Sequence, residues 1–429
     1  MARIFHSLGL SLMLHHLKKI EKPQITLFVN ILVAAFFVTV LTFKKGYSYV
    51  PMTLGVIATF SFLYYRSKLK IKWQLDKEDK YFIFALIAYF LSFVISTIFN
   101  GDGFREIDNP SRILLLIPLI FFFNIYSIKK EIIFHFIPIG SFLVGMLALY
   151  QKFILKWQKP FPDIMHIQAG NISILLGLLS ISIAFYWFAE KKNRIALLYI
   201  IFAAFGLLAS ILSGARGGWI AFPFCFLLIL IYNLQHINKK LIIFISLLLS
   251  VVLAIFIARP EFGIQQRYNE AKSDIIGYFE QGNKNSSLGA RFDMWENAIA
   301  AITEKPILGH GGIGYDNFRE RQMKANKMAK TTYFNSLHNQ YLEASVKRGL
   351  IGFLALIAVL IIPFIIFTKR LKDNNIAIKC TAILGIIHII SHSFFFLSQS
   401  FLAHNSGSMC YFFILILLYY LVKYKEKNI

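Results

Sequence analysis

Residues 195–213 read IALLYIIFAAFGLLASILS and contain no charged side chain. A helix needs about 20 mostly apolar residues to cross the hydrocarbon core of a bilayer, so this stretch is long enough to span one. Similar runs lie on either side of it, at 171–189 and 219–234. The sequence therefore predicts an all-α polytopic membrane protein.

The composition of the whole chain supports this class. The chain has 429 residues, of which 57% are hydrophobic and 16% charged, and its mean hydropathy is +0.60. A soluble globular domain is about 45–50% apolar and about 25% charged. We expect about twelve transmembrane helices, an even number that places both termini on the same side. The runs lie near 23–43, 48–65, 81–99, 113–128, 132–153, 171–189, 195–213, 219–234, 241–258, 349–368, 376–395 and 404–422.

Lysine and arginine residues are concentrated in alternate loops, which the positive-inside rule assigns to the cytoplasm. Both termini are then cytoplasmic, with a basic amphipathic segment at 1–22 and a tail at 423–429. Transmembrane helices one to nine occupy 23–258, and helices ten to twelve occupy 349–422. Because these loops account for the net charge of +23, no nucleic-acid partner is expected.

This orientation leaves the segment 259–348 on the outer side of the membrane. It is the only connection long enough to hold a structure of its own. Lys44 and Lys45 are a local exception to the charge rule on the same side. Helical patterns in the outer segment lie near 263–281, 290–304, 317–331 and 336–348.

Arg216 lies in a glycine-rich turn between two predicted spans, within Ser213-Gly-Ala-Arg-Gly-Gly218. Glycine lets the backbone turn sharply and lets a ligand approach closely. The planar fork of arginine binds phosphate through two parallel hydrogen bonds. Arg216 is therefore a candidate for phosphate binding at the level of the lipid head groups. The alternative is an interfacial anchor whose side chain reaches the head groups.

Arg291 opens a predicted helix in the outer segment. Helix N-termini favour anions through their free N–H groups and the helix dipole, so an arginine there suggests an anion nearby. The alternative is a surface ion pair with Asp293, which contributes little to stability.

His338 is predicted to lie in the first turn of a helix capped by Asn335 or Ser336. An imidazole exchanges its proton near neutral pH and can act as a general base. Asn339 and Glu343 share one face of this helix and can orient a substrate hydroxyl. The alternative is a structural histidine at the membrane interface.

Two motifs in the chain are discounted. Gly309-His-Gly-Gly-Ile-Gly314 matches a dinucleotide-binding pattern, but a helix and a proline precede it where that fold needs a strand. We expect a loop that allows close packing at the bilayer. His388 and His392 have metal-like spacing with no obvious third ligand, and polar packing between helices explains them better. The outer segment has no D-x-D motif and no carboxylate cluster, so no metal is expected.

Three motifs follow one another in order over roughly residues 195–360. In order and topology they resemble the O-antigen ligase family, whose superfamily includes O-antigen polymerases and protein O-oligosaccharyltransferases. The motifs are Ser213-Gly-Ala-Arg-Gly-Gly218, Arg291-Phe-Asp-Met-Trp295 followed by Pro306-Ile-Leu-Gly-His-Gly311, and Leu337-His-Asn-Gln-Tyr-Leu-Glu343 followed by Arg348-Gly-Leu-Ile-Gly352.

The resemblance implies an inner-membrane glycosyltransferase with twelve spans, whose large periplasmic loop is the segment 259–348. Such ligases move a polysaccharide from undecaprenyl diphosphate to the lipid A–core oligosaccharide, invert the anomeric centre and need no metal or cofactor. By matching position, His338 is the general base, and Arg216 and Arg291 bind the diphosphate. Arg112 is a weaker candidate for the same anionic pocket.

The expected partners are thus the lipid-linked polysaccharide donor, the lipid A–core acceptor and membrane lipids. Within the superfamily, a polymerase that joins repeat units and a ligase with a protein acceptor remain as alternatives. A polysaccharide-lipid transporter is the alternative from another class. The sequence shows neither the inverted repeat nor the paired broken helices that are typical of transporters.

Overall fold

The computed structural model describes residues 22–70, 73–233, 264–334 and 336–423, and every regular element in these ranges is helical. Nine of the helices in these ranges are long and apolar enough to cross a membrane. The predicted class, an all-helical multi-pass membrane protein, is therefore confirmed. The total of twelve spans and the side on which the termini lie stay predictions.

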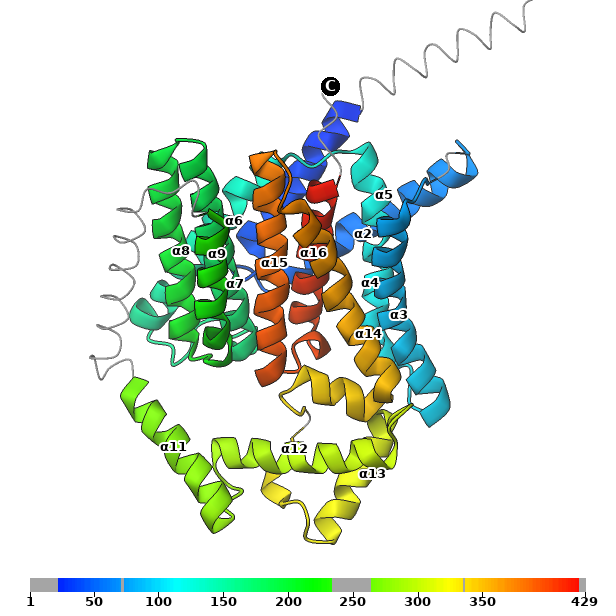
Figure 1. Ribbon diagram of the computed structural model, residues 1–429, viewed down its shortest axis with the longest axis vertical. Helices are drawn as coiled ribbons and strands as arrows, with labels where there is room; N and C mark the ends of the chain where they lie inside the picture. Colours follow the sequence, from blue (N-terminus) through cyan, green and yellow to red (C-terminus); the bar gives the residue numbers. More distant parts are fainter. Residues whose placement is uncertain (1–21, 71–72, 234–263, 335, 424–429) are drawn as a thin grey trace, which may run out of the picture.

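The helices form one bundle with a smaller helical layer beneath one end (Figure 1). The long helices of the bundle are Lys22–Thr39, α2 (Gly46–Ser67), α3 (Lys77–Asn100), α6 (Lys130–Leu149), α7 (His166–Ala189), α8 (Asn193–Ser213), α14 (Gln340–Arg370), α15 (Ile376–Ser398) and α16 (Asn405–Lys423). Shorter bundle helices are α4 (Arg105–Leu116), α5 (Pro118–Ile125), the π-turn η1 (Tyr150–Ile154), η2 (Gly217–Ile220), α9 (Ala221–Asn233) and η6 (Phe401–Ala403).

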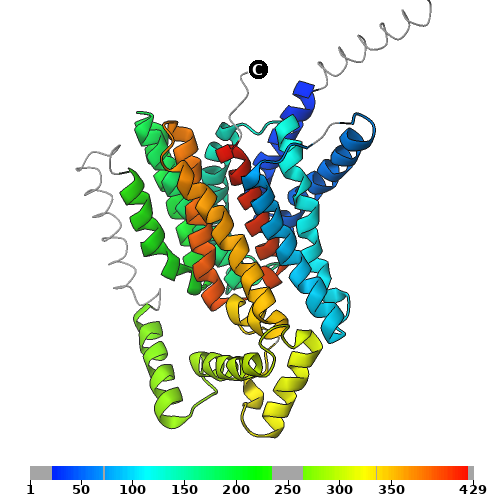
Figure 2. The same ribbon diagram turned by 45° about the vertical axis from the view of Figure 1, so that its right-hand side comes forward.

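The layer beneath the bundle consists of helices from the predicted outer segment, and it lies at the same end in both views (Figures 1 and 2). Its members are α11 (Ile264–Gln281), α12 (Ser287–Glu304), α13 (Gly311–Lys324) and η5 (Lys330–Thr332). They have a small core of their own, which includes Met294, Phe318 and Val346. Because Val346 belongs to α14, this core also fastens the layer to the bundle.

Helices α7 and α16 form the centre of the bundle. Nearly every side chain of both is buried. Around α7 pack α6, α8 and α15, and around α16 pack α2, α4 and α15. These two helices are apolar on all sides, as expected for helices that meet protein in every direction.

One predicted span, 113–128, proves to be two helices. Helix α4 begins earlier, at Arg105, and Pro118 begins α5 after a break at Ile117. Proline has no N–H to donate and favours the first position of a helix, which explains the break. Arg112, which directly precedes the predicted span 113–128, therefore lies within α4.

Other predicted segments fall partly or wholly outside the described residues. These are the amphipathic segment up to residue 21, the predicted span 241–258 and the tail beyond Lys423.

The glycine-rich stretch expected to be a loop begins a helix. Helix α13 starts at Gly311, where the pattern suggested a start near 317. The carboxylate of Asp102, at the end of α3, accepts hydrogen bonds from the N–H groups of Gly312 at 2.8 Å and Ile313 at 2.9 Å. These N–H groups have no partner inside the helix, so a distant carboxylate fixes where the helix starts.

Helix α14 is kinked at Gly349, which has φ 61° and ψ −155°. The stretch after α12 packs into this kink, since Leu350 N donates to Pro306 O at 2.8 Å and His310 N donates to Val346 O at 2.8 Å. A Cβ atom at position 349 would overlap the backbone oxygen of Ile307. The predicted close packing near the glycines is therefore confirmed, and the kink joins the outer layer to the bundle.

We expect Gly349→Ala to lower the thermal unfolding midpoint of the purified protein in detergent. This backbone conformation is accessible essentially only to glycine, and strain of this kind costs about 1–3 kcal/mol before the overlap is counted. Gly103→Ala is the matched control, because nothing lies within 4 Å of a Cβ at that position. An unchanged midpoint for Gly349→Ala would show that the kink at Gly349 is not what holds the outer layer to the bundle.

Candidate functional site

His338 lies just before helix α14 and not in its first turn. The cap of α14 is Asn339, whose side-chain oxygen accepts from Tyr341 N at 3.0 Å and Leu342 N at 3.1 Å. The prediction of a cap at Ser336 is wrong, and Asn335 lies outside the described residues. His338 has φ 50°, a left-handed conformation that is uncommon for a residue with a side chain.

The imidazole of His338 is held by a buried amide. His338 Nδ1 lies 2.8 Å from Gln399 Oε1, and Gln399 Nε2 lies 3.0 Å from His404 Nε2 and 3.4 Å from Met165 Sδ. A thioether sulfur only accepts hydrogen bonds, so the amide nitrogen faces Met165 and the amide oxygen faces His338. Nδ1 of His338 therefore donates, and the lone pair of its other ring nitrogen, Nε2, is left for a ligand.

His404 fits this pattern of donors. Burial lowers the pKa of His404, and the nearby His338 lowers it further. Its imidazole is therefore neutral near pH 7, and Nε2 can accept the amide hydrogen of Gln399. The three side chains form one chain of hydrogen bonds from the α15–α16 connection to the outer segment.

The backbone next to His338 is fixed from two sides. Leu337 N donates to Glu343 Oε2 at 3.0 Å, and Trp295 Nε1 donates to Leu337 O at 2.9 Å. Glu343 is buried and also pairs with Lys347 at 2.8 Å. The carboxylate of Glu343 and the amide oxygen of Asn339 thus accept hydrogen bonds from groups of the protein itself.

The turn that carries Arg216 lies against the same end of α15. Gly214, at φ 75°, ends α8, and a Cβ at Gly217 would overlap the side chain of Ser398. Ser398 directly precedes Gln399, the partner of His338. The turn is therefore packed next to the residues that hold the imidazole, and the Arg216 side chain is exposed there.

Arg291 lies in the second turn of α12, because Ser286 is the cap and accepts from Gly289 N at 3.0 Å. It therefore does not open the helix, as the sequence suggested. Its position four residues before Trp295 places both on one helix face. Since Trp295 binds the carbonyl of Leu337, this face is turned toward the His338 segment.

The predicted pairing of Asp293 with Arg291 is wrong. Asp293 is fully buried and pairs with Lys284 at 2.6 Å, and it accepts from Thr332 Oγ1 at 2.7 Å and Ala329 N at 3.1 Å. Among the described residues, the half-buried side chain of Arg291 forms no hydrogen bond or ion pair. Burial lowers the pKa of Arg291, which is therefore a poorly solvated cation with no carboxylate partner in the described part of the chain.

Arg112 lies nearby but is already paired. Its guanidinium contacts Asp108 at 2.8 Å, one helical turn away. Asn109, on the same helix, donates to Leu402 O at 2.9 Å, which ties α4 to the connection between Gln399 and His404.

The discounted motifs have packing roles in the described structure. No strand precedes Gly309 in the part of the chain that is described, so the dinucleotide-binding alternative has no support. His388 lies 3.0 Å from Tyr411 O, and His392 lies 2.7 Å from His388 O, both within the bundle. Over the described residues, no three His, Cys, Asp or Glu side chains gather as a metal site would require.

Sequence reasoning missed Gln399 and His404. Both lie in Ser398-Gln-Ser-Phe-Leu-Ala-His404, a polar interruption between two apolar helices. The available signal was the presence of four polar side chains in this short segment between two spans. Nothing in the sequence indicates that it contacts His338, 61 positions earlier.

Comparison with known proteins identifies similar chains. Residues 201–357 match a family model described as O-Antigen ligase. An uncharacterized protein of Haemophilus influenzae is 50% identical over 394 residues, which are 92% of this chain and 98% of that protein. The O-antigen ligase of Escherichia coli is 27% identical over 299 residues, 66% of each chain. The exopolysaccharide production protein ExoQ of Rhizobium meliloti is 31% identical over 132 residues, 28% of this chain and 29% of that protein.

We expect Asp293→Ala to loosen the stretch 329–339 that leads to His338. The change removes a charged acceptor from three groups, and a hydrogen bond to a charged group contributes about 1.5–3 kcal/mol. The measurement is hydrogen–deuterium exchange of that stretch, together with the unfolding midpoint. Glu304→Ala is the control, because its ion pair with Arg321 is exposed and contributes at most about 1 kcal/mol. Equal exchange in the two variants would contradict the role assigned to Asp293.

Proposed function

The chain belongs to the O-antigen ligase family, and from this we propose that it is itself an O-antigen ligase. The proposed enzyme is an inverting, metal-independent glycosyltransferase of the bacterial inner membrane. It transfers O-antigen polysaccharide from undecaprenyl diphosphate to the lipid A–core oligosaccharide on the periplasmic side. The matched residues 201–357 include Arg216, Arg291 and His338.

The observation that carries the proposal is the free ring nitrogen of His338. Because Nδ1 donates to Gln399 Oε1, the lone pair of Nε2 can take a proton from an acceptor hydroxyl. The acceptor oxygen then bonds to the anomeric carbon of the donor sugar from the face opposite the diphosphate. The bond between that carbon and the phosphate oxygen breaks, and undecaprenyl diphosphate leaves.

The two arginines are proposed to bind the leaving diphosphate. Negative charge grows on the phosphate oxygens as the bond breaks, and fixed cations stabilise that charge best. Arg291 suits this role because it is a half-buried cation without a counter-charge among the described residues. Arg216 suits it because its turn packs beside Ser398 and Gln399, close to the proposed base.

The arrangement also separates the parts of the donor. The polyprenyl tail would lie between the bundle helices, in the hydrocarbon core, while the sugars stay in water under the outer layer. The diphosphate linkage itself supplies the free energy of transfer. The proposed reaction therefore needs no nucleotide.

We expect His338→Ala to reduce transfer by about 10²–10⁴-fold, the usual contribution of a general base. Arg216→Ala and Arg291→Ala should each weaken the stabilisation of the departing diphosphate. The measurement is the ladder of lipopolysaccharide on gels of a strain that lacks its own ligase, at equal membrane levels of each variant. Arg321→Ala is the control, since its guanidinium is exposed and already pairs with the exposed carboxylate of Glu304.

Normal ladders from all three site variants would contradict the assignment. A strain that lacks this protein but still carries a single repeat on the core would instead indicate a polymerase. Transfer by the purified enzyme to a protein acceptor, and not to lipid A–core, would indicate the protein-directed alternative.

Gln399 is a positioning residue, and two substitutions separate this role from a structural one. We expect Gln399→Leu to lower kcat by about 10–100-fold with little change in the donor KM, because the imidazole loses its orienting partner. Gln399→Glu should move the acid limb of the pH–rate profile to higher pH, because a carboxylate beside Nδ1 stabilises the protonated ring. A profile unmoved by Gln399→Glu, with full activity in Gln399→Leu, would remove Gln399 from the mechanism.

A further inference from the structure

A basic surface adjoins the proposed site on the side of α6 and α7. It is formed by the turn Phe43–Lys45 and by the connection from Tyr150 to Asp163, and we call it the lysine surface. These two stretches contain five lysines and one carboxylate. The lysines are Lys44, Lys45, Lys152, Lys156 and Lys159, and the carboxylate is Asp163.

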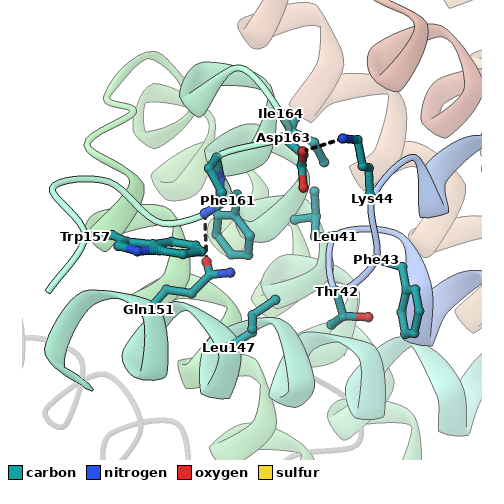
Figure 3. A pocket seen from close by; sticks show the side chains of 11 residues that line it. Leu41, Thr42, Phe43, Lys44, Leu147, Gln151, Trp157, Phe161, Asp163 and Ile164 are labelled. Carbon is teal, nitrogen blue, oxygen red and sulfur yellow. Dashed lines mark hydrogen bonds and ion pairs between the residues drawn. The ribbon is translucent and has the colours of Figure 1, made fainter. Parts of the chain in front are cut away.

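The lysine surface lies at the same end of the bundle as His338. Asp163 is joined to Lys44 by an ion pair of 3.4 Å, which links the two stretches (Figure 3). Met165, two positions after Asp163, accepts from Gln399 Nε2 at 3.4 Å. The connection that carries three of the lysines therefore leads directly to a residue that contacts Gln399, the partner of His338.

The connection has a defined backbone. The buried side chain of Gln151 accepts from Phe161 N at 2.8 Å, as Figure 3 shows, and Trp157 N donates to Gln151 O at 3.0 Å. Lys156 and Phe161 both adopt left-handed conformations, with φ 58° and 62°. The lysines are thus presented by a structured turn that begins as a π-helix, a form often found at functional sites.

Exposed apolar side chains lie in the same stretches as the lysines and indicate where the lysine surface meets the membrane. Phe43, Phe153 and Ile154 are 67%, 53% and 69% exposed, and Trp157, which is 39% exposed, belongs to the same connection as Phe153 and Ile154. In a membrane protein such side chains meet lipid, and tryptophan favours the level of the head groups. Lysine stems lie along the apolar surface while their ammonium groups reach the head-group layer. Exposed lysines beside such side chains are suited to contact lipid phosphates.

The charge is unexpected for this side of the protein. If the site faces the periplasm, as proposed, the positive-inside rule predicts few lysines in these loops. Only Lys44 among the five forms an ion pair with a described residue, while Lys152 donates to the backbone oxygen of Gln158 at 2.7 Å. A cluster of this kind attracts anions at the membrane surface.

We propose that the lysine surface binds the phosphate groups of the acceptor glycolipid, which holds the acceptor in the outer leaflet beside His338. This rests on the proposed function and adds to it the place where the second substrate docks. The cavity shown in Figure 3 has a volume of about 90 Å³, far below the roughly 300–1,000 Å³ of a pocket that encloses a ligand. The contact is therefore with a head group at the surface. Since the arginines serve the donor diphosphate, the lysines remain for the acceptor.

The test compares the full-length protein with a triple variant, Lys152→Gln, Lys156→Gln and Lys159→Gln. Binding of phosphorylated lipid A–core, and of the same lipid after enzymatic dephosphorylation, is measured by native mass spectrometry in detergent without donor. We expect the wild type to prefer the phosphorylated lipid and the triple variant to bind it at least about tenfold more weakly. In transfer assays the acceptor KM should rise while kcat and the donor KM stay unchanged.

Two controls accompany this variant. Changing the same three lysines to arginine keeps the charge and should keep the preference, which excludes misfolding as the cause. Changing Lys68, Lys77 and Lys80 to glutamine, at the opposite end of the bundle, should leave binding as in the wild type.

Equal binding of both lipids by the wild type, or wild-type binding by the glutamine triple variant, would overturn the inference. So would an equal loss of phosphatidylglycerol binding with an unchanged acceptor KM, which would make the surface a general lipid anchor. Because binding is measured without turnover, a wild type that binds selectively but transfers nothing would contradict the proposed function alone.

Discussion

The hydrogen bond between His338 Nδ1 and Gln399 Oε1 is the contact on which the proposed site depends. It connects the outer layer to the membrane bundle across the point where the two meet. It also selects the tautomer of the imidazole, because only a protonated Nδ1 can donate to the amide oxygen. In the proposed reaction this leaves Nε2 as the base. The turn that carries Arg216 packs beside the same amide, so one end of α15 organises both the base and a cation.

The surrounding structure stabilises an unusual backbone at His338. A left-handed non-glycine residue of this kind costs of the order of 1–3 kcal/mol, and such strain persists only where neighbours impose it. Here Glu343 binds the N–H of Leu337, Trp295 binds its carbonyl, and Asn339 caps the helix that follows. These contacts explain the presence of these polar residues in a chain that otherwise consists mainly of apolar helices. They also give Asn339 and Glu343 a positioning role beside the proposed chemistry.

The sequence was sufficient to predict the fold class and to single out the isolated polar residues. Runs of spanning length predicted the bundle, and an arginine in a glycine turn or a lone histidine in an outer segment stood out against apolar surroundings. It could not give contacts between distant positions. The start of α13 depends on Asp102, about two hundred positions earlier, and the partner of Asp293 is Lys284 across a helix cap. Gln399 was missed for the same reason, since local patterns carry no information about which loop a buried amide will meet.

The proposed mechanism requires Arg216 and Arg291 to hold a diphosphate opposite the free nitrogen of His338. A cryo-electron microscopy structure of the full-length protein in nanodiscs with undecaprenyl diphosphate tests it most directly. We expect guanidinium nitrogens of both arginines within about 2.7–3.2 Å of diphosphate oxygens, with His338 Nε2 facing the phosphate from which the sugar departs. A diphosphate bound at the opposite end of the bundle, or in contact with neither arginine, would contradict it.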